Sequence, residues 1–334
     1  MNHKNILIID LTSGLCNQLN TIAKSIILAE IFGRNIYFNS FQIHYNINDN
    51  KMDFNKIINV DKLQENINKL NLNVIIHKKL DINPIEIIQF NSNIQKYTSI
   101  EDYISLIKKQ DHIKYLNIES STLPVIPEKY KTILDSIVLD IHFNDKFINF
   151  ASRIKETFNL NNYICVHLRM EDDCLNYMAA LLNNLSLKEI ENIYKDIYTK
   201  ELEKISKYNV KIYICSSLCI YENNNNHFYK ELKKKYNLID KNDLLLSINL
   251  ENNNHKCREL YGIIDYLIAK DSTYFVGCDW SAFSISLYNN HMFHKKNTTL
   301  LNLWQSCLDT NDKINNEEKK QTNNGVLYTM NTGR

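Results

Sequence analysis

Glycine, proline and arginine are scarce in this sequence. Its 334 residues include only 6 Gly and 3 Pro, against usual frequencies of about 7% and 5%. Asn, Ile and Lys are in excess. Codons made only of A and T encode these three residues, so the excess indicates an A/T-rich genome. A Gly or Arg that does occur therefore indicates a local structural or chemical requirement. The five arginines are Arg34, Arg153, Arg169, Arg258 and Arg334.

The chain also has little net charge and no long apolar run. The formal net charge is +1 at pH 7 and no basic stripe interleaves with aromatic residues, so a nucleic-acid partner is not expected. No apolar stretch approaches the roughly 18 residues that a transmembrane segment needs. Apolar residues make up 44% and charged residues 23% of the chain, which is usual for a globular protein with a large core.

The N-terminal residues 1–10 do not have the pattern of a signal peptide. Their apolar run is short and ends at Asp10 rather than at a small-residue cleavage site. We therefore expect the chain to remain soluble in a reducing cytosol or viral factory. The eight Cys are scattered and contain no C-x-x-C pair, so no structural metal is predicted.

Strand-like and helix-like segments alternate along the chain, which predicts an α/β fold with parallel sheets covered by helices. A first series opens with a strand at 5–10, a helix at 17–33 and a strand at 35–39. A second series starts with the strong strand signal at 162–168. We therefore predict two facing Rossmann-like lobes. The expected parts are an N-terminal lobe at 1–155, a C-terminal lobe at 156–310 and a disordered tail at 311–334.

The remaining expected elements follow the same alternation, except in one ambiguous stretch at 45–110. The excess of Asn and Ile blurs the helix and strand signals there, and only 74–76 is strand-like. Another strand is expected at 112–118. The other helices are predicted at 128–158, 186–207, 226–236, 255–270 and 281–290, and the other strands at 210–216 and 273–277.

Polar residues collect at three places, each at the carboxyl end of a predicted strand, where open α/β sheets bind ligands. The first place is the segment 13–19. Gly14 permits a tight turn there, and Asn17 lies near the helix N-terminus. The Asn17 amide can cap the helix, or it can point a donor and an acceptor into a cleft.

The second place follows the most apolar strand, which ends in His167, Arg169 and a run of acids. Burying so many charges is costly unless they pair or meet a charged ligand. The planar donor fork of Arg169 matches a phosphate, so the arrangement suits a diphosphate leaving group. A structural ion pair between Arg169 and Asp173 is the alternative. Glu171, Asp172 and Asp173 are the candidates for a general base, unless the leaving phosphate takes the proton.

The third place begins with a helix that contains Asp265 and continues through a strand to a Gly turn at Gly277. Ser281 and Ser284 then start a new helix. A helix N-terminus with free amides and hydroxyls is a ready phosphate site. Ser281 is alternatively a simple N-cap, and Phe283 is either a core residue or a stacking platform for a base.

Signatures of several other enzyme classes are missing. The sequence contains no G-x-G-x-x-G, no G-x-x-x-x-G-K-[ST] and no G-x-S-x-G, which disfavours dinucleotide enzymes, P-loop NTPases and α/β-hydrolases. Asp-x-Asp is also absent, so paired acids that hold a divalent metal on a diphosphate are not expected. Arginine and helix amides are then the candidate cationic partners of a diphosphate.

The three places, in this order, resemble the O-fucosyltransferase superfamily over most of residues 5–290. The segment 13–18 resembles the family's Gly–Asn–Gln loop, and His167-Leu168-Arg169 matches its His-x-Arg motif. Phe275-Val276-Gly277 with Ser281-x-Phe283 is similar to the Phe-Ile-Gly and Ser-Ser-Phe motifs of the animal enzymes. The run 167–175 is closer to the plant branch.

The resemblance implies roles for single residues. Asn17 would lie beside the reacting sugar, Arg169 would grip the donor diphosphate and Asp265 would contact the nucleotide base. Ala282 stands where the family has a Ser or Thr. The expected catalytic residues are Arg169, Asn17, Asp173 and Glu171. The expected donor-binding residues are Gly14, Asn17, His167, Arg169, Asp265, Gly277, Ser281, Ala282, Phe283 and Ser284.

The resemblance also implies a GT-B-like fold and metal-independent, inverting transfer of fucose from GDP-fucose, without a cofactor. The C-terminal lobe would hold the nucleotide sugar, and the N-terminal lobe would take a glycan, protein or small-molecule hydroxyl acceptor. Two alternatives stay open. Part of the plant branch uses UDP-rhamnose, and the plant-like run 167–175 favours that donor. Ala282 and the lack of a clear base favour an inactive sugar-nucleotide-binding protein.

Overall fold

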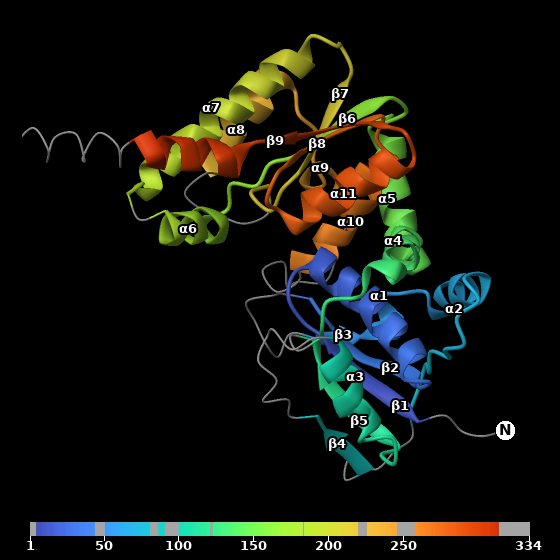
Figure 1. Ribbon diagram of the computed structural model, residues 1–334. Helices are drawn as coiled ribbons and strands as arrows, with labels where there is room; N and C mark the ends of the chain where they lie inside the picture. Colours follow the sequence, from blue (N-terminus) through green and yellow to red (C-terminus); the bar gives the residue numbers. More distant parts are fainter. Residues whose placement is uncertain are drawn as a thin grey trace, which may run out of the picture. The chain divides into compact units, whose positions relative to one another are not determined.

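The chain forms two compact α/β units in the computed structural model. Unit 1 consists of Met1–Ala151 and Glu251–Ile264, and unit 2 of Ser152–Leu250 and Asp265–Arg334 (Figure 1). The return of 251–264 to unit 1 differs from the two consecutive lobes expected from the sequence. The structure describes residues 5–43, 51–80, 86–90, 100–120, 123–182, 184–219, 226–245 and 258–313.

Unit 1 is built on a sheet in the order β3-β2-β1-β5-β4. All described neighbours in it run parallel, except β3, which is antiparallel to β2. Its strands are β1 (Ile6–Leu11), β2 (Asn35–Gln42), β3 (Lys51–Asp53), β4 (Ile87–Gln89) and β5 (Tyr115–Glu119). Its helices are α1 (Leu15–Ile31), α2 (Val60–Lys69), α3 (Ile100–Lys108) and α4 (Lys131–Leu139), with short 3₁₀ turns at η1 (Phe54–Lys56) and η4 (Glu128–Tyr130).

Helix α1 covers one face of this sheet because its apolar residues repeat at helical spacing. The face expected from the sequence is confirmed, since its five residues are at most 1% exposed. The helix packs on β1, β2 and α4. Together with the strand β1, it places the segment 12–14 at the carboxyl edge of the sheet. The five residues are Leu19, Ile22, Ala23, Ile26 and Ala29.

Unit 2 is built on a fully parallel sheet in the order β7-β6-β8-β9. Its strands are β6 (Tyr163–His167), β7 (Lys211–Cys215), β8 (Tyr274–Cys278) and β9 (Asn297–Leu301). Its helices are α6 (Asp172–Leu181), α7 (Leu187–Ser206), α8 (Asn226–Tyr236), α9 (Asn242–Leu245), α11 (Ala282–Phe293) and residues 303–313. Helices α5 (Asp145–Thr157) and α10 (Arg258–Asp271) cross the division between the units. The predicted α/β class with two parallel-dominated sheets is confirmed.

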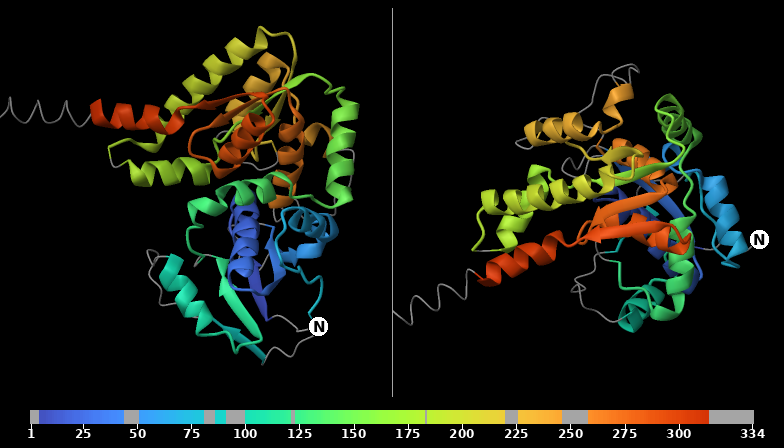
Figure 2. Two further views of the ribbon diagram at one scale, coloured as in Figure 1. Left: turned by 45° about the vertical axis from the view of Figure 1, so that its right-hand side comes forward. Right: turned by 90° about the horizontal axis from the view of Figure 1, so that it is seen from above.

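The two faces of the unit 2 sheet meet different helices, because successive side chains of a strand point to opposite sides. Ile164 and Val166 join an apolar cluster with residues of α6, α7 and α8. His167 faces the other side and meets α11. Figure 1 shows α7 and α8 on one side of the sheet and α10 and α11 on the other. The helix 303–313, red in Figure 2, follows β9.

Differences from the predicted elements occur both inside and outside the ambiguous stretch 45–110. Residues 74–76 form only a bridge between Ile76 and Ile36. The elements that were not predicted are strands β3, β4 and β9, helices α2, α3, α6 and α9, and the helix 303–313. Residues 311–313, expected in a disordered tail, continue a helix, and 314–334 lie outside the described residues. Within the described ranges, no helix is long and apolar enough to cross a membrane.

Candidate functional site

Arg169 lies two residues beyond the end of β6 and holds two carboxylates. Its Nη1 donates to Glu171 Oε2 at 2.8 Å, and its Nη2 donates to Asp173 Oδ2 at 2.8 Å. Burial lowers the pKa of Arg169, but the carboxylates outweigh this and keep the pKa above its ordinary value. The ion pair with Asp173 that the sequence suggested as the alternative is therefore present, and a permanently charged guanidinium stands at the carboxyl edge of the sheet.

Glu171 is the buried partner of this ion pair, with a side chain that is 8% exposed. Its Oε1 accepts hydrogen bonds from the backbone nitrogen of Ser217 at 2.9 Å and from the Ser217 hydroxyl at 2.6 Å. The carboxylate thus ties the β6–α6 loop to the loop after β7. Both carboxylate oxygens of Glu171 therefore have hydrogen-bond donors, and its role as a general base stays a prediction.

Asp173 is the more accessible partner of Arg169, with a side chain that is 27% exposed. It lies in the first turn of α6 with Asp172, where the helix dipole favours negative charge. Its second oxygen, Oδ1, is 3.5 Å from Arg169 Nη1. The two acids on Arg169 therefore differ: Glu171 is also bonded to the loop after β7, whereas Asp173 is the more exposed of the two.

Tyr198 on α7 fixes the backbone at the end of β6. Its hydroxyl donates to the carbonyl oxygen of His167 at 3.0 Å and accepts from the backbone nitrogen of Arg169 at 3.0 Å. The side chain is fully buried. Sequence reasoning missed this residue, because helical periodicity shows only that Tyr198 faces the core and does not show where its hydroxyl bonds.

His167 connects β6 to the first turn of α11. Its Nδ1 is 2.7 Å from the Ser284 hydroxyl, which also accepts from the backbone nitrogen of Cys278 at 2.9 Å. The Phe283 ring lies 4.7 Å from the His167 ring and 6.0 Å from that of Tyr266, measured between centroids. The structure therefore brings together the second and third places that the sequence singled out.

The N-terminus of α11 presents backbone amides at this position. Ser281 is at the N-cap, but its hydroxyl makes no capping hydrogen bond. The first helical bond runs from the nitrogen of Ile285 to the oxygen of Ser281 at 2.9 Å. The amides of Ala282, Phe283 and Ser284 precede that bond and carry the positive end of the helix dipole. Such a terminus favours an anion.

The sequence predicted that Gly277 lies in a turn. The structure instead places it inside β8, where α11 packs closely on the strand. A Cβ at this position would lie 2.7 Å from the Cβ of Ser284 and 2.8 Å from Cε1 of Phe275. Only a residue without a side chain fits there. Gly277 thus allows the approach that joins Ser284 to His167, and it acts through packing rather than through a turn.

Asp265 is buried in an ion pair, at 4% exposure. Its Oδ2 accepts from Lys241 Nζ at 2.6 Å, and its Oδ1 accepts from the Tyr213 hydroxyl at 2.9 Å. Burial raises the pKa of Asp265 to about 6 despite the nearby Lys241. Lys241 also donates to the carbonyl oxygen of Ser216 at 2.7 Å. Both carboxylate oxygens of Asp265 therefore have buried partners, and its expected contact with a nucleotide base stays a prediction.

In unit 1, the loop between β1 and α1 has a different geometry from the expected one. The left-handed residue is Ser13, with φ of 81°, whereas Gly14 has an extended conformation that any residue adopts. Gly14 is the N-cap, so Asn17 is not a cap. Asn17 is exposed on the first turn of α1, and its amide donates to the Ser13 hydroxyl at 3.1 Å. A Cβ on Gly14 would have no neighbour within 4 Å among the described residues.

Three buried polar side chains that sequence reasoning missed hold this loop. Gln18 donates to the carbonyl oxygens of Ser13 and Gln42, each at 2.8 Å. Gln42 Oε1 accepts from the backbone nitrogen of Ser13 at 2.6 Å. Glu259 Oε2 accepts from the nitrogen of Leu15 at 2.6 Å. Gln18 belongs to the recognised Gly–Asn–Gln segment, but no local sequence pattern indicates its hydrogen-bond partners.

Comparisons with known proteins decide the family. The family described as GDP-fucose protein O-fucosyltransferase matches residues 7–294. The chain belongs to this family. The resemblance stated from the sequence is confirmed, and the chain is a glycosyltransferase of the O-fucosyltransferase type. A search of curated protein sequences finds no match.

Solved structures share the fold of this O-fucosyltransferase family member. The apo form of POFUT1 has a TM-score of 0.59 at 11% identity, over 90% of this chain and 99% of that one. POFUT1 in complex with GDP-fucose has a TM-score of 0.54 at 12% identity, over 86% and 95%. The NodZ α1,6-fucosyltransferase soaked with GDP-fucose has a TM-score of 0.50 at 11% identity, over 86% and 92%.

The close packing at Gly277 gives a stability prediction for this O-fucosyltransferase. We expect Gly277→Ala to lower the free energy of unfolding by about 1–3 kcal/mol, because its Cβ must displace Ser284 or Phe275. Urea unfolding followed by circular dichroism measures this change. Gly262→Ala is the matched control: it lies within α10, and its Cβ would meet Leu15 at an ordinary 3.6 Å. There we expect a gain of roughly 0.5–1 kcal/mol. Equal effects of the two substitutions would contradict the packing role.

Proposed function

We propose that the chain transfers fucose from GDP-fucose to a hydroxyl acceptor, with inversion and without a metal ion. Unit 2 holds the nucleotide sugar in this proposal, and unit 1 takes the acceptor through the loop that carries Asn17. The family description names GDP-fucose as the donor. POFUT1 in complex with GDP-fucose and NodZ soaked with GDP-fucose share the fold.

The observation that carries the proposal is the charged Arg169 at the edge of β6, joined through the His167–Ser284 contact to the N-terminus of α11. Transfer breaks the bond between the sugar's anomeric carbon and the diphosphate oxygen, and negative charge develops on the leaving diphosphate. A preorganised guanidinium and helix amides stabilise this charge in the transition state more than in the ground state. These groups supply the positive charge that a metal ion supplies in other transferases.

The two carboxylates on Arg169 have different parts in this proposal. Glu171 keeps the guanidinium oriented, because its second oxygen is bonded to Ser217. Asp173 is the half-buried partner, and the donor diphosphate takes its place on Nη2. A carboxylate that neutralises the guanidinium in the free enzyme lowers the cost of holding the charge at a partly buried position.

The new glycosidic bond forms between the acceptor oxygen and the anomeric carbon, and the acceptor proton must go to a base. Asp173, released from Arg169, is better suited to take it than Glu171, which stays bonded on both oxygens. The exposed amide of Asn17 orients the sugar or the acceptor hydroxyl, which reduces the entropy cost of bringing them together. The acceptor is a hydroxyl of a glycan, a protein or a small molecule.

Substitution of Arg169 tests its assigned role. We expect both Arg169→Ala and Arg169→Lys to slow GDP release from GDP-fucose by about 10²–10³-fold, because a Lys cannot reproduce the bidentate fork. Turnover is measured as GDP formed with water or added acceptor. Arg153→Ala and Arg153→Lys are matched controls, since Arg153 is exposed on α5. Near-normal turnover of the Arg169→Lys variant contradicts the role.

Calorimetry with GDP and UDP tests the donor. We expect GDP to bind more tightly than UDP to the wild-type chain. Tighter binding of UDP would reject GDP-fucose in favour of UDP-rhamnose, the donor that the plant-like run 167–175 suggests. Tight GDP binding without turnover on GDP-fucose would instead support a sugar-nucleotide-binding protein that has lost activity, as Ala282 suggests.

A further inference from the structure

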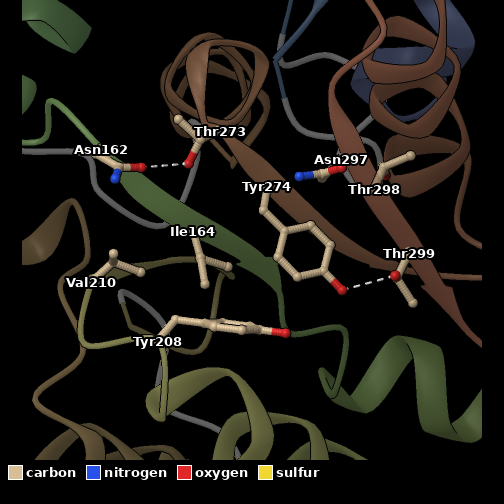
Figure 3. Close-up of a pocket in the computed structure, with 9 residues that line it drawn as sticks. All are labelled: Asn162, Ile164, Tyr208, Val210, Thr273, Tyr274, Asn297, Thr298 and Thr299. Atoms are coloured by element: carbon tan, nitrogen blue, oxygen red, sulfur yellow. Dashed lines mark hydrogen bonds between the residues drawn. The ribbon is translucent and has the colours of Figure 1, made fainter.

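An open cavity of about 530 Å³ lies on the unit 2 sheet, away from Arg169. Figure 3 shows the side chains around it. Its volume falls in the range of small-ligand sites, about 300–1,000 Å³. The lining residues are Asn162, Ile164, Tyr208, Val210, Thr273, Tyr274, Asn297, Thr298 and Thr299.

The cavity is at the amino edge of the sheet, opposite the proposed donor site. Asn162 precedes β6, and Tyr274 and Asn297 begin β8 and β9. His167 is at the other end of β6, and five strand residues separate the two edges by about 13 Å. A ligand in this cavity therefore does not occupy the position proposed for the donor diphosphate.

The lining is about half polar and half apolar, and it carries no charged side chain. Hydrogen-bond contacts hold its polar groups in place: Thr273 Oγ1 shares its proton between Asn162 Oδ1 at 3.0 Å and the carbonyl oxygen of Tyr163 at 2.8 Å, and the Tyr274 hydroxyl is 2.8 Å from Thr299 Oγ1. The side-chain amide of Asn297 makes no hydrogen bond to any residue in the described ranges. Fixed hydroxyls and available amides suit a ligand that has many hydroxyl groups.

Two aromatic rings give the cavity part of its apolar surface. Tyr208, just after α7, is 56% exposed, so its ring is accessible to a ligand. The Tyr274 ring comes from the first residue of β8, and Figure 3 shows both rings near Ile164. Tyrosine rings offer flat apolar faces together with a polar end. A matching ligand has apolar faces as well as hydroxyl groups.

We propose that this cavity is a second, non-catalytic site that binds a neutral saccharide. A sugar ring has C–H faces that pack on tyrosine rings and hydroxyls that bond to Asn and Thr side chains. A nucleotide fits less well, because none of the lining side chains is a cation and Lys204, which lies near Tyr208 and Tyr274, is paired with Glu201. The site goes beyond the proposed transfer reaction and does not depend on it.

Saccharide binding with the donor site filled tests this proposal. The probes are the neutral disaccharides N,N′-diacetylchitobiose and lactose, added to the full chain in saturating GDP and followed by saturation-transfer NMR and calorimetry. We expect at least one of them to bind with a dissociation constant on the order of 1 mM. Tyr208→Ala is expected to weaken this binding about tenfold and to leave GDP release from GDP-fucose unchanged.

Tyr177→Ala is the matched control, because Tyr177 is a similarly exposed tyrosine, at 55%, on α6. We expect it to leave disaccharide binding unchanged. The proposal is overturned if neither disaccharide binds, if Tyr177→Ala weakens binding as much as Tyr208→Ala, or if adenosine binds at the cavity in place of the sugars. Circular dichroism of each variant shows that the fold is kept.

Discussion

The ion pair of Arg169 with Glu171 and Asp173 is the interaction on which the rest of the proposed donor site depends. A guanidinium at the end of a buried strand is stable only with charged partners, and the chain supplies two of them within four residues. Glu171 transmits this constraint to the loop after β7, and Tyr198 fixes the backbone on either side. The cation is therefore already oriented before any anion arrives.

Close packing is a second constraint. It explains a rare glycine by the absence of a Cβ rather than by the backbone freedom that a turn requires. Gly277 lets α11 approach β8, so that Ser284 reaches His167 and the helix N-terminus lies beside the end of β6. Gly14 shows the opposite case, because its backbone is extended and no described residue would contact a Cβ at this position. An open position at a helix N-terminus is one where a ligand can approach the backbone.

The sequence predicted the fold class and the face of α1, and it singled out the segment with His167 and Arg169 and the start of α11 as separate places, because these depend on local patterns of apolar residues and on strand ends. It did not predict where buried polar groups find their partners. Tyr198, Gln18, Gln42 and Glu259 bond to residues distant in sequence or to backbone atoms, and no local pattern shows such contacts. The same limit applies to Asp265, whose buried pairing with Lys241 depends on the tertiary fold.

A crystal structure of the chain with GDP tests the central claim most directly. We expect the diphosphate to accept hydrogen bonds from the Arg169 guanidinium and from the amides of Phe283 and Ser284 at the start of α11. Asp173 should then have moved off Nη2, while Glu171 stays bonded to Ser217. Ordered GDP without a phosphate contact to Arg169, and with both carboxylates still on the guanidinium, would contradict the account.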